Sequence, residues 1–294
     1  TPEQRALREA NVGMYVFDRA ALTPVVAALD TENAQGERYL TDVVGPLAAG
    51  GDAVAHVVDM AETAGVNDRA QLAEAGVALR RRHLLALMRD GVGVVDPAHT
   101  YVDVDVAVEP DATLLPGTIL EGATRIAAGA VVGPNSHLTD CEVGTGAVVH
   151  STRADGARIG AGVEVGPFAH LRPGTVLGEG ARVGAFVQTK NAAVGPGAKV
   201  PHLAYVGDAD VGAGANVACG VVTVNYDGRA KHRTVVGEGA FVGCGTMLVA
   251  PVEVGAGAYV AAGSTITDDV PPEALAIGRA RQVVKEGRAR GRLG

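Results

Sequence analysis

The chain has 294 residues, a formal net charge of −8 and only 3% aromatic residues. The acidic balance argues against a general nucleic-acid binder, and no apolar stretch is long enough for a signal peptide or a membrane span. Its three cysteines show neither CxxC spacing nor a disulfide framework, so we expect a reducing compartment, the bacterial type of cytoplasm.

The first 97 residues alternate strand-like and helix-like segments. The pattern predicts strands over residues 12–17 and 53–58, and helices over 18–29, 36–48 and from 67 or 68 to about 88. This α/β pattern is too short for a complete doubly wound domain. Because the chain also starts at Thr1 without a methionine, we expect a fragment or a trimmed protein.

From about residue 114 to residue 266, the chain repeats every six residues with an aliphatic side chain at most repeat positions. One run is Ile159, Val165, Leu171, Leu177 and Val183, and glycine or another small residue fills many positions between. This period predicts a parallel β-helix and a mainly β fold, over a second domain of residues 98–294 that follows a first domain of residues 1–97. Residues 225–233 interrupt the repeat and should project as a loop.

Two cations stand out against this repeat. Three hexapeptides make one coil, so Arg172 and Lys190, which are eighteen residues apart, should project from one face of successive coils. Stacked like charges are unfavourable without an anion between them, and this favours a phosphate site. The alternative is a solvated pair balanced by Glu179 or Asp208.

His202 follows Pro201 and should lie at a corner of the coil, close to the basic pair. Histidine exchanges protons around neutral pH, so we predict that His202 is a general base. The alternative is a structural or exposed and idle histidine.

Several segments resemble the bacterial family of bifunctional N-acetylglucosamine-1-phosphate uridyltransferases/glucosamine-1-phosphate acetyltransferases. Residues 166–174 (GPFAHLRPG) are similar to that family's GPFARLRPG segment. The other similar segments are residues 33–42, 65–69, 183–187, 202–209, 224–228, 248–252 and 276–279. Together they are spread over nearly the whole chain.

The resemblance implies a left-handed β-helix preceded by an incomplete α/β nucleotidyltransferase segment, a homotrimer, and acetyl transfer from acetyl-CoA to glucosamine 1-phosphate for UDP-N-acetylglucosamine and cell-wall synthesis. It gives His202 the role of the base. The implied sugar-phosphate residues are Arg172, Lys190, Tyr205, Asn216, Asn225, Tyr226 and Lys231. The implied acetyl-CoA contacts are Cys219, Asn225, Tyr226, Cys244, Ala262 and Arg279.

The resemblance also implies that part of the uridyltransferase site is missing. Its Gly-rich nucleotide loop, its early lysine and its Mg²⁺-binding aspartate should lie upstream of Thr1. Asn11 and Asn67 match sugar-nucleotide contacts, and Asn67 also matches a metal contact. We therefore expect Mg²⁺-dependent uridyl transfer only in an intact parent protein.

Three departures from the family pattern bear on acetyl transfer. Gln188 replaces a common glutamate near the histidine, Cys219 replaces a small alanine-type residue, and Cys244 replaces a serine. One rival function is a metal enzyme similar to hexapeptide carbonic anhydrases, but His170 and His202 are out of register and no third histidine completes the set. Another rival is a non-catalytic trimeric scaffold.

Overall fold

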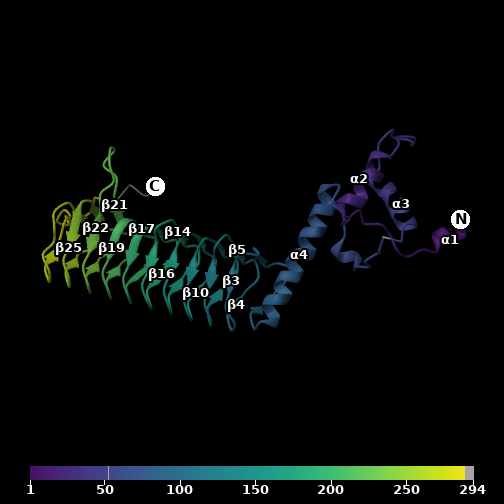
Figure 1. Ribbon diagram of the computed structural model, residues 1–294. Helices are drawn as coiled ribbons and strands as arrows, with labels where there is room; N and C mark the ends of the chain where they lie inside the picture. The colour runs from purple at the N-terminus through teal and green to yellow at the C-terminus, as the bar shows by residue number, and fades with distance from the viewer. Residues whose placement is uncertain (52, 289–294) are drawn as a thin grey trace. The chain divides into compact units, whose positions relative to one another are not determined.

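The computed structural model describes residues 1–51 and 53–288 (Figure 1). The chain divides after Val77 into two compact units. This division falls inside the helix that the sequence analysis placed in the first domain, so the boundary at residue 97 stays a prediction. None of the described helices is long and apolar enough to cross a membrane.

The first unit is built from short helices and irregular segments. The helices are α1 (Pro2–Arg5), α2 (Arg19–Ala27), η1 (Leu40–Val43), α3 (Val44–Ala49), η2 (Met60–Glu62) and the start of α4 (Arg69–Arg89). Helices α2 and α4 begin at side-chain caps, because the side chains of Asp18 and Asp68 accept hydrogen bonds from the backbone N–H groups of Ala21 and Gln71.

The two strands predicted in this unit are wrong. Residues 12–17 and 53–58 are irregular, and Val16 and Val54 are almost fully exposed. A strand needs a hydrogen-bonded neighbour and an apolar face to pack on. Within the described part of residues 1–77 no strand is present to supply either, so the local β pattern alone does not form a sheet. The predicted helix over 36–48 is shortened to η1 and α3.

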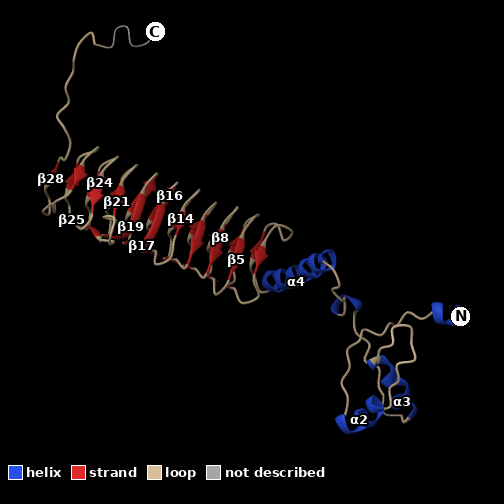
Figure 2. Cartoon of the chain, turned by 90° about the horizontal axis from the view of Figure 1, so that it is seen from above, coloured by secondary structure: helices blue, strands red, loops and turns tan. Residues whose placement is uncertain are grey.

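The second unit is a parallel β-helix with three ladders of strands, which we call faces 1, 2 and 3 (Figures 1 and 2). Face 1 consists of β1 (Gly93–Val94), β4 (Thr113–Leu114), β7 (Val131–Val132), β10 (Val148–Val149), β13 (Glu164–Val165), β16 (Arg182–Ala185), β18 (Lys199–His202), β20 (Asn216–Val217), β23 (Phe241–Val242), β26 (Tyr259–Val260) and β28 (Leu275–Ala276).

Faces 2 and 3 share two long strands that run through the corner between them, β17 (Gln188–Val194) and β19 (Tyr205–Val211). Face 2 also contains β2 (Tyr101–Val102), β5 (Ile119–Glu121), β8 (His137–Thr139), β11 (Arg153–Asp155), β14 (His170–Leu171), β21 (Val222–Val224), β24 (Met247–Val249) and β27 (Thr265–Ile266). Face 3 also contains β3 (Ala107–Val108), β6 (Arg125–Ile126), β9 (Glu142–Val143), β12 (Arg158–Ile159), β15 (Val176–Leu177), β22 (Thr234–Val236) and β25 (Val252–Val254).

The six-residue repeat explains this prism. One inward aliphatic side chain per face fills a narrow core, as shown by Leu171, Val183 and Leu248, which are fully buried. Leu84 of α4 is buried in the same core cluster and covers its first coil. The predicted parallel β-helix and mainly β fold are confirmed. Strand pairing does not define the handedness of the β-helix, so its left-handed coil is still the one that the resemblance implies.

Candidate functional site

His202 begins a row of residues along the corner between faces 1 and 2. Lys199 pairs with Asn216 and Tyr205 pairs with Val222, so His202 and Cys219 occupy the same position on successive coils. The Gly220 N–H donates to the Leu203 carbonyl at 3.0 Å, which fixes this stacking of the two turns.

The next coils continue the row with Cys244 and Ala262. The Gly245 N–H donates to the carbonyl of Cys219, and the Gly263 N–H donates to the carbonyl of Cys244, both at 2.8 Å. We call His202, Cys219, Cys244 and Ala262 the corner row. It brings the predicted base into line with three of the predicted acetyl-CoA contacts.

Arg279 lies over the end of the corner row. Its Cδ is 3.8 Å from the place that a Cβ would occupy on Gly263, so the long side chain covers the turn that follows Ala262. Arg279 is exposed, and a guanidinium in this position is suited to a phosphate. The predicted acetyl-CoA contacts outside the projecting loop therefore gather at one corner.

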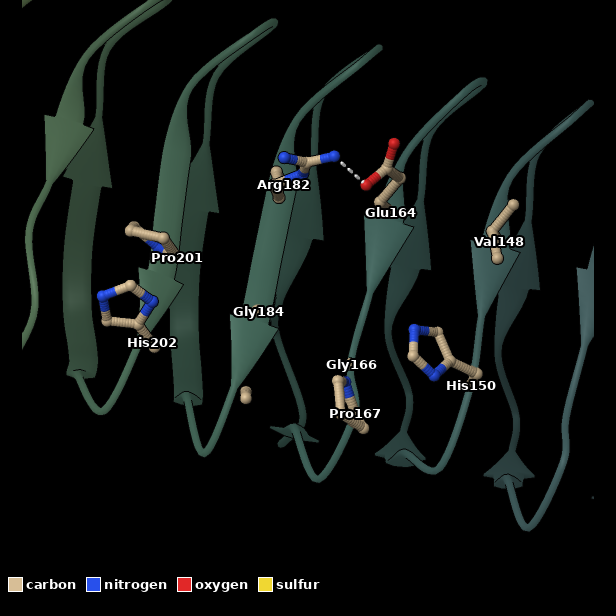
Figure 3. A pocket seen from close by; sticks show the side chains of 10 residues that line it. Val148, His150, Glu164, Gly166, Pro167, Arg182, Gly184, Pro201 and His202 are labelled. Carbon is tan, nitrogen blue, oxygen red and sulfur yellow. Dashed lines mark hydrogen bonds and ion pairs between the residues drawn. The ribbon is translucent and has the colours of Figure 1, made fainter.

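A groove on face 1 reaches His202 (Figure 3). Pro201 and His202 line one end of it, and His150 lies on an earlier coil. Between them Arg182 makes an ion pair with Glu164 across neighbouring coils. Within the described chain the ring of His202 has no hydrogen-bond or ion-pair partner, so both ring nitrogens are available to a ligand.

Three cations gather at a different corner, the one between faces 2 and 3. Arg172 donates its N–H to the Thr189 carbonyl at 2.9 Å, which places it beside Lys190 on the next coil, as predicted. The close approach of the Lys231 side chain, followed by burial and the charges of Lys231 and Arg172, lowers the pKa of Lys190. We call Arg172, Lys190 and Lys231 the basic cluster.

Asp208 supplies one negative charge beside the basic cluster. Its side chain is only 8% exposed and accepts hydrogen bonds from the Asn191 amide at 2.7 Å and from the Asn225 amide. Burial opposes its ionisation, but these hydrogen bonds and the charges of Lys190 and Lys231 prevail and lower its pKa. Asp208 thus offsets the basic cluster in part, as the alternative interpretation anticipated, and leaves an excess of positive charge.

The loop over residues 225–233 projects next to β21, as predicted (Figure 1). Contacts between residues of the loop itself fix its conformation. Tyr226 and Lys231 form an isolated antiparallel bridge. The Asp227 carboxylate accepts hydrogen bonds from the backbone N–H groups of Arg229 and Ala230, both at 2.7 Å, and lies 2.7 Å from His232 Nε2. These contacts lower the pKa of Asp227.

Arg233 fixes the base of the loop through an ion pair with Asp210. The loop therefore brings Lys231 over a coil of its own chain.

Tyr205 and Gln188 lie on face 2 between the two corners. They pair in register on successive coils, and the Asn225 amide donates to the Tyr205 hydroxyl at 3.4 Å. Asn225 thus links the Tyr205 hydroxyl to the Asp208 carboxylate. Asn216 lies on face 1 beside Lys199 and Phe241, away from the basic cluster.

The predicted remnant residues of the uridyltransferase half lie in the first unit. Asn11 hydrogen-bonds with Tyr15 at 2.5 Å and with the Gly13 N–H at 3.0 Å, and Asn67 precedes the cap of α4. A single amide oxygen does not make a Mg²⁺ site. Among the described residues, no group of three or more His, Cys, Asp or Glu side chains is placed to hold a metal ion. The Mg²⁺ contact at Asn67 stays a prediction for a longer protein.

Two further residues, Asn191 and Asp208, belong to the site. The sequence pattern did not single out Asn191, and it offered Asp208 only as a charge that could balance the basic pair. They are seventeen residues apart, which is one coil here, and both turn the same corner with a positive φ of 44° and 47°. Asn and Asp tolerate this backbone conformation, so a corner position alone gives them a structural explanation. Their mutual hydrogen bond is visible only once the coil register is known.

Comparisons with known proteins support the resemblance predicted from the sequence. The family described as "Bacterial transferase hexapeptide (six repeats)" matches residues 156–191 and 233–268. The chain is 51% identical over 289 residues to the "Bifunctional protein GlmU" of Pseudarthrobacter chlorophenolicus, covering 98% of this chain and 59% of the relative. It is 49% identical over 284 residues to the GlmU of Brevibacillus brevis, covering 96% of this chain and 62% of the relative.

The chain thus spans about three fifths of the length of these curated relatives. Among solved structures, LpxA from Acinetobacter baumannii is 15% identical with a TM-score of 0.32, and covers 60% of this chain and 71% of its own. That likeness is too low to carry an argument.

Proposed function

We propose that this chain, a homologue of the bifunctional GlmU proteins along nearly all of its length, transfers an acetyl group from acetyl-CoA to the amine of glucosamine 1-phosphate. The observation that carries the proposal is the basic cluster, in which Lys231, Lys190 and Arg172 converge beside the buried carboxylate of Asp208. Such an excess of charge favours a bound phosphate. A scaffold without a ligand has no use for it, so the non-catalytic alternative is not favoured.

His202 is the proposed general base. The amine lone pair of the sugar attacks the carbonyl carbon of the acetyl thioester, and His202 accepts the proton that the nitrogen loses. The carbon–sulfur bond then breaks, and coenzyme A leaves as a thiol after it takes up a proton. The products are N-acetylglucosamine 1-phosphate and coenzyme A.

The corner row is the proposed path of acetyl-CoA. Its residues lead away from His202 over successive turns and end under Arg279. With its thioester beside His202, the rest of acetyl-CoA would lie along Cys219, Cys244 and Ala262. One of its phosphates would then reach Arg279. Asn225 and Tyr226 belong to the loop beside the basic cluster and are proposed contacts to both ligands.

The separation of the two corners supports a homotrimer with shared sites. Lys190 pairs with Gly207, five residues along the coil from His202, and a strand advances about 3.3 Å per residue. The amine and phosphate of glucosamine 1-phosphate sit on neighbouring carbons, so one sugar fits poorly across face 2 of a single chain. A closed trimer of three-faced prisms would bring one subunit's His202 to the basic cluster of another.

A thiol-release assay tests the proposed reaction. We expect release of coenzyme A that requires both acetyl-CoA and glucosamine 1-phosphate, with a product heavier than the sugar phosphate by one acetyl group. Glucosamine without phosphate should react far more slowly because it lacks the anion that the basic cluster binds. Equal rates with the two sugars, or no release with either, would reject the proposal.

Mixed trimers test the shared site. Light scattering should give a trimeric mass. Subunits carrying His202→Ala, mixed with subunits carrying Lys190→Ala, should regain part of the activity that each variant has lost, because some sites would then combine two intact residues. A monomeric mass, or mixtures no more active than the separate variants, would contradict a site between subunits.

The remaining functions belong to the intact parent and the cell. We propose that an intact parent also transfers uridylate from UTP with Mg²⁺, and that both reactions supply UDP-N-acetylglucosamine in the cytoplasm. The name of the relatives, "Bifunctional protein GlmU", is consistent with two activities.

A further inference from the structure

We propose that Cys219 and Cys244 form a thiol pair that peroxide oxidises to a disulfide across the corner row. Both are departures from the residues that the family resemblance leads us to expect. The pairing itself rests on the fold alone, while its effect on acetyl-CoA rests on the proposed function.

The strand register places the two cysteines directly over one another. Before them, Val217 pairs with Val242, and after them Val222 pairs with Met247, an offset of twenty-five residues in both cases. The same offset joins Cys219 to Cys244. The loop over residues 225–233 lies beyond Val222, so it does not disturb this register.

The spacing of the two turns suits a disulfide. The Gly245 N–H donates to the Cys219 carbonyl at 2.8 Å, and a Cβ on Gly220 would lie 3.6 Å from the Gly245 Cα. Neighbouring strands lie about 4.8 Å apart, which is within the Cα separation of about 4.4–6.8 Å found in disulfides. Equivalent positions on stacked coils project their side chains in the same direction, so both thiols stand on the same corner.

The three cysteines differ in their access to an oxidant. Cys244 is exposed and Cys219 is half-buried, whereas Cys141 is fully buried. Burial raises the pKa of the Cys141 thiol, whose Sγ–H donates to the Thr139 carbonyl at 3.2 Å. Because the thiolate is the reactive form, Cys141 is inert and serves as an internal control.

The reaction balances with hydrogen peroxide as the oxidant. The Cys244 sulfur attacks one peroxide oxygen, the O–O bond breaks, and a sulfenic acid and water form. The Cys219 sulfur then attacks the sulfenic sulfur and releases a second water. Two thiols have given two electrons and two protons, and a reductant dithiol reverses the step by exchange.

The consequence is a reversible block of the corner row. A disulfide would fix Cys219, the neighbour of His202, to Cys244, the neighbour of Ala262. The thioester end of acetyl-CoA would then meet a rigid bridge in place of two mobile thiols. We infer that mild oxidation lowers acetyl transfer and that reduction restores it.

The experiment counts thiols in the denatured protein before and after a short peroxide treatment. We expect the count to fall from three to one, a mass lower by two hydrogen atoms, and a proteolytic peptide pair that joins Cys219 to Cys244 while Cys141 stays alkylatable. Cys219→Ala and Cys244→Ala should each prevent the joined pair. Three thiols that persist, or cysteines that oxidise separately without a joined pair, would overturn the proposal.

Activity is measured on the same samples, each variant against its own untreated rate. In the unsubstituted chain we expect peroxide to lower coenzyme A release about tenfold or more and a dithiol to restore it; in each single variant the ratio should stay near one. A disulfide that leaves release unchanged would overturn the proposed block. An untreated chain that releases no coenzyme A would reject the proposed function, while the thiol count would still decide the pairing.

Discussion

The β-helix and the first unit differ in how their apolar residues are used. In the β-helix the repeat places Leu171, Val206 and Leu248 in a core with no exposed surface. In residues 1–77 Met14, Val16 and Val54 remain largely exposed, and Val43 is the one large apolar side chain fully buried among the described residues. Coils that stack on their neighbours in the sequence thus form their own core. A strand-like segment of an α/β pattern buries its apolar residues only when it pairs with other strands in a sheet.

The largest effect should come from the proposed base of the β-helix. His202→Ala should lower turnover by about 10²–10⁴-fold, the usual contribution of general acid–base catalysis. Acetyl-CoA affinity should change little, because the base acts on the amine.

The matched control is His99→Ala. This histidine is exposed, lies at the far end of the β-helix and pairs with Asp96 at 2.7 Å. Steady-state rates of coenzyme A release measure both variants. Near-normal turnover in His202→Ala would make this histidine structural and place the base elsewhere.

A pair of glycine substitutions compares the two units directly. A Cβ on Gly184 in β16 would lie 1.8 Å from the Pro201 carbonyl oxygen, so Gly184→Ala should destabilise the β-helix by about 3 kcal/mol or more. Gly76 lies in α4 with open space around it, so Gly76→Ala should stabilise that helix by up to about 1 kcal/mol. Thermal unfolding measures both, and equal effects would contradict the contrast in packing.

The basic cluster should decide affinity for the sugar phosphate. Arg172→Ala and Lys190→Ala should each weaken apparent binding of glucosamine 1-phosphate by about ten- to a hundredfold, since charge-assisted contacts to phosphate are strong. Arg158→Ala is the control, because this exposed cation lies on face 3 and pairs with Glu142 at 3.6 Å. Unchanged affinity in both cluster variants would remove the phosphate site.

The smallest effect concerns pH. The close approach of Lys231 is the largest cause of the lowered pKa of Lys190. Lys190 should therefore lose its proton at a lower pH than its ordinary pKa of 10.5 implies. Affinity for glucosamine 1-phosphate should therefore fall early as the solution becomes alkaline. In Lys231→Met the alkaline midpoint should move to higher pH, and in Lys199→Met it should not. An unmoved midpoint in Lys231→Met would show that the two ammonium groups do not interact.

The sequence was most informative where chemistry follows the six-residue period. The spacing of Arg172 and Lys190 predicted their stacking, and the break after Val224 predicted the projecting loop. The approach of Lys231 to Lys190 does not follow from the spacing of the repeat, because it depends on loop contacts such as Asp227 with His232. Only the resemblance grouped these two lysines. The prediction that His202 lies close to the basic pair is wrong within one chain, because Lys190 pairs with Gly207, five residues further along the coil. The period gives a position along a coil but not the corner at which a strand ends.

The strands expected over residues 12–17 and 53–58 failed for a different reason. Their alternation is a local signal, and pairing is a property of the whole sheet. The helices over the same region were predictable because their hydrogen bonds and caps, such as that of Asp18, are local.

The rates of coenzyme A release and of pyrophosphate release, measured together, test the contrast between the two units most directly. The 294-residue chain is supplied with acetyl-CoA, glucosamine 1-phosphate, UTP and Mg²⁺, and the release of coenzyme A and of pyrophosphate is followed in parallel. We predict coenzyme A release, because the β-helix carries both the basic cluster and the corner row. We predict no pyrophosphate release, because among the described residues no group of three or more His, Cys, Asp or Glu side chains joins Asn67 to hold Mg²⁺. Pyrophosphate release, or the absence of coenzyme A release, would contradict these predictions.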